Sequence, residues 1–136
     1  MSTGLTQAAV GDLVAQYDTG PVTREQLQAY ARASGDLNPL HLDQAFAQKA
    51  GFDDVIVHGM LGMALLGRLL TGPLGAHPLR AFNARFGAVI PVGRALHCRA
   101  YLDAIESDGY RLRLEAVDDR GTVAIGGQAI VRASVR

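Results

Sequence analysis

The stretch "GMLGMALLGRLLTG", residues 59–72, is the longest apolar run in the chain, and we expect the fold to form around it. A helix drawn over residues 59–71 carries large apolar side chains on every face. These side chains are Met60, Leu61, Met63, Leu65, Leu66, Leu69 and Leu70. A helix that is apolar all round is typically buried. Arg68 interrupts the run, which is also shorter than the ~20 residues needed to cross a bilayer. The stretch therefore predicts the central helix of a globular core and no membrane span.

After this helix the apolar period changes to two. "LHCRAYLD" (96–103) and "YRLRLEA" (110–116) alternate apolar and polar side chains, which is typical of half-buried antiparallel strands. The "SDG" and "DDRG" segments that follow them are hairpin turns. A last strand is expected over residues 122–134, with a β-bulge at Gly126-Gly127 that shifts its phase.

The segment before the central helix reads as one strand followed by short helices. "DLVAQYDTG" (12–20) is the strand, and the spacing of Thr23 and Gln26 predicts a capping box at a helix start. That helix ends at Gly35, and Asp43 can cap a second short helix that stops at Gly51.

This order of elements predicts a single α+β domain over residues 1–136, in which an antiparallel sheet of about five strands wraps round the central helix. An open sheet leaves an exposed edge, and pairing with a second copy is the simplest way to cover it. We therefore expect a homodimer or another even-numbered assembly.

Composition excludes several classes of protein. With 136 residues the chain can bury one core, and its formal net charge of zero lacks the basic excess expected of a nucleic-acid binder. Cys98 is the only cysteine, so no disulfide can form within the chain; it lies on the apolar side of its strand and is expected in the core. The first residues lack the pattern of a signal peptide, and a cytoplasmic protein is expected.

The stretch "ASGDLNPLHLD" (33–43) carries the first candidate chemistry. Asn38-Pro39 predicts a turn that brings Asp36 and His41 toward one small volume. A carboxylate and an imidazole in one pocket can act as a general acid/base pair. The alternative is structural: Asp36 would accept backbone N–H groups at the helix end, and His41 would be a hydrogen-bonded core histidine.

The second candidate is Gly59, which follows His58 at the predicted start of the central helix. The first N–H groups of a helix have no intrahelical acceptor, and a glycine lets a carbonyl oxygen approach closely, so this position could form an oxyanion site. The alternative is that Gly59 only permits a tight turn. His41, Asp43 and His58 could also be considered as metal ligands, but no ligand-spacing signature supports a metal site, and we expect none.

Residues 30–66, "YARASGDLNPLHLDQAFAQKAGFDDVIVHGMLGMALL", resemble the signature of the MaoC-like, (R)-specific enoyl-thioester hydratases and 3-hydroxyacyl-thioester dehydratases. The resemblance implies a hot-dog fold, an acyl thioester substrate carried by coenzyme A or acyl carrier protein, and no cofactor. It also implies that Asp36 and His41 form the catalytic dyad, that Asn38 orients the water, and that Gly59 polarises the thioester carbonyl. Some short-chain members carry a serine where this chain has Gly67. Gly67 is therefore expected to border a roomier acyl pocket.

Two rival functions remain open at this stage. A hot-dog thioesterase would use a carboxylate to activate water against the carbonyl carbon, and a non-catalytic acyl-binding subunit would have little reason to keep both Asp36 and His41. The sequence leaves open the acyl-chain length, the carrier, the pathway, and whether the assembly is homo- or heteromeric. It also leaves open whether an arginine near the strand ends meets the phosphates of the carrier. The candidates are Arg80, Arg85, Arg94 and Arg99.

Overall fold

The computed structural model describes residues 4–133. The first half of the chain forms a 3-10 turn η1 (Leu5–Gln7), strand β1 (Leu13–Pro21), helix α1 (Arg24–Ser34), a 3-10 turn η2 (Pro39–His41), helix α2 (Gln44–Lys49) and helix α3 (Gly59–Thr71). The second half forms strands β2 (Leu79–Phe86), β3 (Ala95–Ile105), β4 (Gly109–Asp118) and β5 (Val123–Arg132).

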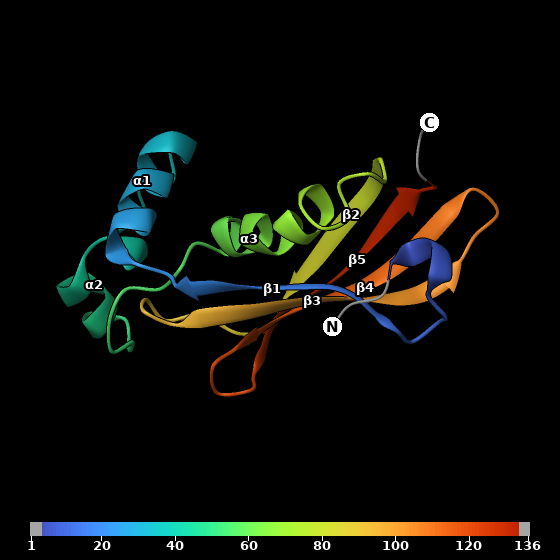
Figure 1. The fold of residues 1–136 in the computed structure, drawn as a ribbon. Coiled ribbons are helices and arrows are strands. Elements are labelled where there is room, and N and C mark those ends of the chain that lie inside the picture. Colours follow the sequence, from blue (N-terminus) through green and yellow to red (C-terminus); the bar gives the residue numbers. More distant parts are fainter. Residues whose placement is uncertain (1–3, 134–136) are drawn as a thin grey trace.

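The five strands form one sheet in the order β1-β3-β4-β5-β2, and every neighbouring pair is antiparallel. The sheet curls, α3 crosses its concave face, and α1 and α2 lie together beyond one end of it (Figure 1). This is the predicted α+β hot-dog arrangement. No helix within residues 4–133 is long and apolar enough to cross a membrane.

The residues predicted to cap or end the two short helices are confirmed. Thr23 caps α1 through a capping box with Gln26, and Gly35 ends the helix in a left-handed conformation with φ 81°. Asp43 caps α2 by accepting the N–H of Phe46 at 3.1 Å. These caps fix both ends of the loop over residues 35–43, which carries the candidate polar residues.

The core lies between α3 and the sheet. Leu65, Leu66, Leu69 and Leu70 of α3 are buried against strand residues of alternating position, such as Leu96, Leu112 and Leu114. Cys98 is buried and unpaired within this cluster, as predicted. The Tyr17 hydroxyl on β1 donates to the carbonyl of Leu65, which ties the sheet to the middle of the helix.

Two sequence-based expectations are wrong, one about the burial of α3 and one about the bounds of the last strand. The helix is not buried on every face: Met60 is 57% exposed, and Ala64, Arg68 and Thr71 are also exposed. The physical reason is that a single sheet covers only one side of α3. The last strand ends at Arg132, short of the predicted 122–134, whose final residue lies outside the described part of the chain.

The predicted β-bulge is also misplaced. Gly126 and Gly127 pair in regular register with both β4 and β2, and the irregularity in the β4–β5 ladder lies between Ala116 and Val117. Gly127 instead permits close approach of a neighbouring backbone, since a Cβ there would lie 2.5 Å from the carbonyl oxygen of Asn83. A Cβ at Gly126 would meet nothing within 4 Å.

These adjacent glycines give a matched test of the packing of the sheet. Gly127→Ala should destabilise the protein by ~1–3 kcal/mol, the usual cost of overpacking, because backbone atoms of β2 would have to move. Gly126→Ala should be neutral or slightly stabilising, because glycine is unfavourable in a strand and the added methyl group has free space. Thermal unfolding followed by circular dichroism measures both changes. Equal melting temperatures for the two variants would contradict this account.

Candidate active site

The loop between α1 and α2 presents Asp36, Asn38 and His41. Asp36 Oδ1 accepts the N–H of Asn38 at 3.3 Å, and Asn38 Oδ1 accepts the N–H of Leu40 at 3.0 Å. The second bond closes the turn that η2 begins with Pro39. The amide oxygen of Asn38 therefore has a structural role, and the second carboxylate oxygen of Asp36 is left to face His41.

His41 is held with one ring nitrogen toward Asp36. Its Nδ1 lies 2.7 Å from the carbonyl oxygen of Ile56, and since a carbonyl can only accept, Nδ1 carries the proton and donates. In the neutral ring Nε2 then holds the lone pair, and this nitrogen lies 4.0 Å from Asp36 Oδ2. That separation is too long for a direct hydrogen bond, yet one water molecule could contact both atoms at about 2.8 Å.

The two side chains differ in exposure. The His41 side chain is 12% exposed and that of Asp36 is 50% exposed. The imidazole thus sits at the protein side of the pair and the carboxylate at the solvent side.

Gly59 lines the same cavity as His41. It is the first residue of α3, and the N-cap residue His58 makes no side-chain cap bond among the described residues. The first N–H groups of any helix have no intrahelical acceptor, and they lie at the positive end of the helix dipole. A cavity of about 360 Å³ lies beside this turn. Its lining residues are His41, Ile56, Val57, Gly59, Phe86, Gly87, Ala88, Val89, Ile90 and Ile125. His41 and the first residue of α3 thus line one largely apolar space, whose lining, among the described residues, does not include Asp36 or Asn38.

The structure separates Gly67 from this cavity. The cavity lining, as far as residues 4–133 define it, does not include Gly67, and a Cβ at that position would lie 3.2 Å from the ring of Phe82. The space left by the missing side chain is therefore filled by an aromatic ring from β2. The roomier acyl pocket at Gly67 stays a prediction.

His58 is the site residue whose place the sequence analysis missed. It is 1% exposed, its ring stacks on that of His41 with centroids 3.9 Å apart, and its Nε2 lies 3.2 Å from the carbonyl oxygen of Asp36. Burial lowers the pKa of His58, and this outweighs the opposing effect of the bond to Asp36. The sequence signal was its place directly before Gly59, at the start of the central helix; from the sequence alone, His58 was considered only as a metal ligand, together with His41 and Asp43.

The metal alternative finds little support in the geometry. Asp43, one of the three residues considered, caps α2 instead. Ligand atoms of Asp36, His41 and His58 do lie within 4.8 Å of one another. However, imidazole lone pairs lie in the ring planes, and the planes of His41 and His58 are only 21° from parallel, so their lone pairs do not converge on one point.

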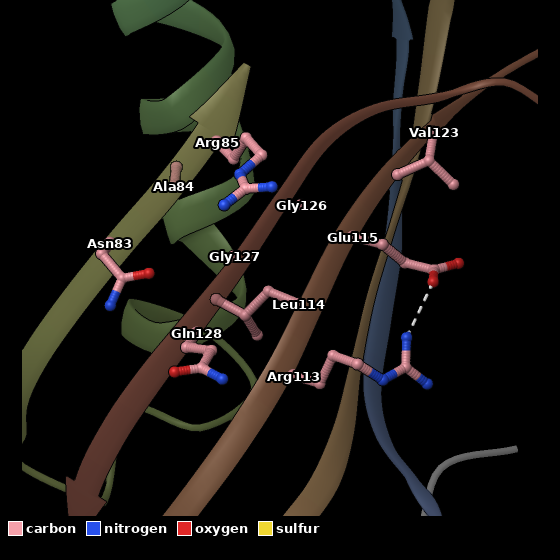
Figure 2. Close-up of a pocket in the computed structure, with 10 residues that line it drawn as sticks. All are labelled: Asn83, Ala84, Arg85, Arg113, Leu114, Glu115, Val123, Gly126, Gly127 and Gln128. Carbon is pink, nitrogen blue, oxygen red and sulfur yellow. Dashed lines mark hydrogen bonds and ion pairs between the residues drawn. The ribbon is translucent and has the colours of Figure 1, made fainter. Parts of the chain in front are cut away.

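The four candidate arginines make contacts other than with this cavity. Arg80, Arg94 and Arg99 pair with Asp108, Asp119 and Glu115, at 2.8, 2.9 and 3.8 Å. Arg85 lines a different groove of about 750 Å³, over Gly126 and Gly127, where Figure 2 shows Arg113 paired with Glu115. Within the described residues, none of the four lines the cavity that His41 and Gly59 share.

A curled five-stranded antiparallel sheet round one helix, with a polar loop beside the start of that helix, defines a protein of the hot-dog class. The family profile described as "MaoC like domain" matches residues 6–122, and the chain belongs to this family.

Three similar proteins illustrate the match. A mitochondrial 3-hydroxyacyl-(acyl-carrier-protein) dehydratase of Arabidopsis thaliana is 35% identical over 95 residues, which are 70% of this chain and 49% of that protein. The chain thus spans about half the length of that relative. The (R)-specific enoyl-CoA hydratase of Aeromonas caviae is 32% identical over 111 residues, 79% of this chain and 83% of that protein. The unliganded R-hydratase of Pseudomonas aeruginosa has a TM-score of 0.86 at 26% identity, over 96% of this chain and 85% of that one.

The lowered pKa of His58 predicts a pH dependence of stability. As pH falls through the ordinary histidine value of 6.5, the unfolded chain binds a proton at His58 that the folded chain resists, so the folded state loses stability. His58→Gln removes this titration. The melting temperature of the wild type should therefore fall more between about pH 7 and about pH 5 than that of the variant. Parallel melting curves across this range would contradict the prediction.

Proposed function

We propose that the protein reversibly hydrates trans-2-enoyl thioesters to (R)-3-hydroxyacyl thioesters. The observation that carries the proposal is the placement of His41 Nε2, 4.0 Å from Asp36 Oδ2, at the cavity on which the start of α3 also opens. Membership of the MaoC-like family supports it, as do the names of the hydratase and dehydratase relatives.

The chemistry follows from which atoms are free. A water held between Asp36 Oδ2 and His41 Nε2 gives a proton to the nitrogen as its oxygen bonds to Cβ of the substrate. The C=C electron pair moves toward the thioester oxygen, where the Gly59 N–H stabilises the developing negative charge. The proton then passes to Cα, which restores the carbonyl. Asn38 would help to orient the water with its side-chain N–H groups. Dehydration is the same path in reverse.

The rival functions use less of this arrangement. A thioesterase needs one carboxylate that activates water to attack the carbonyl carbon. The His41 Nε2 lone pair would then have no role. A non-catalytic acyl-binding subunit needs neither Asp36 nor His41. The expected substrate class is an acyl thioester, carried by coenzyme A or by acyl carrier protein.

The dyad can be tested by substitution. Asp36→Asn keeps the shape of the side chain but removes the basic carboxylate, and His41→Ala removes the imidazole. General acid/base groups typically contribute ~10²–10⁴-fold, so each change should lower kcat for crotonyl-CoA hydration by about that factor. The double variant should be hardly worse than the worse single one, because both groups act on one water. Loss of absorbance of the conjugated thioester follows the reaction.

The chain supplies a matched control for this test. Asp18 and His97 form a second carboxylate–imidazole pair, 2.7 Å apart, on β1 and β3. Neither residue lines the His41 cavity as the described residues define it. Asp18→Asn and His97→Ala should leave kcat unchanged. Near-normal hydration by a well-folded Asp36→Asn protein would refute the mechanism.

We propose that Gly67 borders the far end of the acyl path, behind the ring of Phe82. Gly59 and Gly67 are eight residues apart, about 12 Å along the helix, and each faces a phenylalanine of β2. A long acyl chain extended along α3 would have to displace Phe82.

Phe82→Ala should therefore raise kcat/KM for octenoyl- and dodecenoyl-CoA relative to crotonyl-CoA, by about tenfold if a few methylene groups gain contacts. Gly67→Leu, added to Phe82→Ala, should refill the space and reverse the gain. Steady-state kinetics on the three substrates measure the ratio. Equal effects at all chain lengths would mean that Gly67 and Phe82 serve packing only.

We propose further that the protein is a homodimer joined through β2 and the open face of α3. β2 is an edge strand, and both β2 and α3 expose large apolar side chains: Leu79 and Phe86 of β2 are 46% and 49% exposed, and Met60 of α3 is 57% exposed. Pairing of two β2 edges would cover this surface and satisfy the free backbone groups of the edge.

Light scattering at micromolar protein should give twice the mass of the chain, or a larger even multiple. Leu79→Asp should shift the protein toward the monomer by placing a charge in the contact. Val10→Asp is the control, because Val10 is 60% exposed on the segment before β1 and should not affect the mass. A fully active wild-type monomer would contradict the proposal.

A further inference from the structure

Local helix physics does not explain the presence of His58. It occupies the N-cap of α3, where serine, threonine, asparagine or aspartate would cap the first N–H groups, yet its side chain makes no cap bond among the described residues. The ring is buried, and its Nδ1 finds no hydrogen-bond partner within residues 4–133. Both features cost stability, so the residue needs another explanation.

The contacts of the His58 ring supply this explanation. Its face stacks on His41, with the planes 21° apart, and its Nε2 lies 3.2 Å from the carbonyl oxygen of Asp36. Since the carbonyl can only accept, Nε2 carries the proton and donates. The edge of the Tyr30 ring packs against His58 with centroids 4.8 Å apart. One side chain therefore contacts both members of the candidate dyad, and α1 as well.

We propose that His58 is a positioning residue for the reaction: its ring sets the plane of His41, and its Nε2–H holds the backbone of Asp36. The inference rests on the proposed hydratase function. The titratable groups that face the ring are Asp36, His41 and Tyr30. Burial lowers the pKa of His58, which disfavours a positive charge on the ring that stacks on His41.

Position matters here because the reacting groups come from separate elements. Asp36 follows α1, His41 ends η2, and Gly59 begins α3 directly after His58. The 4.0 Å spacing of Asp36 Oδ2 and His41 Nε2 therefore depends on contacts that join these segments. A displacement of about 1 Å in a reacting geometry can cost about 10²-fold in rate. His58 is not among the described residues that line the cavity, so its loss should affect kcat much more than KM.

Three substitutions separate the two contacts. His58→Phe keeps the stacked ring without the N–H donor, His58→Gln keeps a donor without the ring, and His58→Ala keeps neither. We expect kcat for crotonyl-CoA to fall by about 10²-fold in His58→Ala and by less in the other two, with KM within about twofold of wild type. His77→Ala is the matched control: His77 also meets a backbone carbonyl, at 3.1 Å, and packs on Tyr110, but lies far along the chain from the dyad.

A double-variant test distinguishes positioning from general damage. In an Asp36→Asn background, His58→Ala should lower kcat by less than about threefold, because the dyad through which it acts is already disabled. Wild-type kcat in all three His58 variants, a similar loss in the Asp36→Asn background, or a change confined to KM would each overturn the inference.

Nuclear magnetic resonance of the imidazole nitrogens gives a readout that does not depend on turnover. The His41 signals should shift or broaden in His58→Ala and be largely restored in His58→Phe. Unchanged His41 signals in His58→Ala would overturn the inference even if the wild type hydrates crotonyl-CoA. A wild type that is inactive on every enoyl thioester, with His41 signals that respond to His58, would instead overturn the proposed function and keep the positioning role.

Discussion

The packing of α3 against the concave face of the sheet is the contact on which the rest of the structure depends. Leu65, Leu66, Leu69 and Leu70 bury one face of the helix, and the hydroxyl of Tyr17 holds the carbonyl of Leu65. Burial of apolar surface is the main force available to a domain of this size. Because one sheet can cover only one side of a helix, the same packing leaves the opposite face of α3 exposed.

The candidate site is a consequence of where this helix begins. The first turn of α3 cannot satisfy its own N–H groups, and it emerges from the core beside the loop that carries Asp36 and His41. His41 is fixed by Ile56, which precedes the helix by only a few residues, and His58 lies against both dyad members. The helix that organises the core therefore also brings the polar groups of the site together.

The cavity is shaped by side chains of β2 and β5 that pack against α3. Phe82 and Phe86 project from β2 toward Gly67 and Gly59, and Ile125 of β5 packs over Gly62, where a Cβ would lie only 2.7 Å from its Cδ1. Glycine in the helix thus lets the sheet approach, and the sheet side chains fill the space. The cavity that His41 lines lies where Phe86 packs against Gly59.

The sequence by itself determined the features that arise from local chemistry: the helix over 59–71, the caps at Thr23, Gly35 and Asp43, the alternation in β3 and β4, and the dense motif around Asp36 and Gly59. Each depends on residues within a few positions of one another. Only the tertiary structure decided which face of α3 stays open, that Gly126 and Gly127 pair without a bulge, that Phe82 fills the space at Gly67, and that His58 stacks on His41. These outcomes depend on contacts between segments far apart in the chain, and side-chain spacing along one segment carries no information about what packs against it.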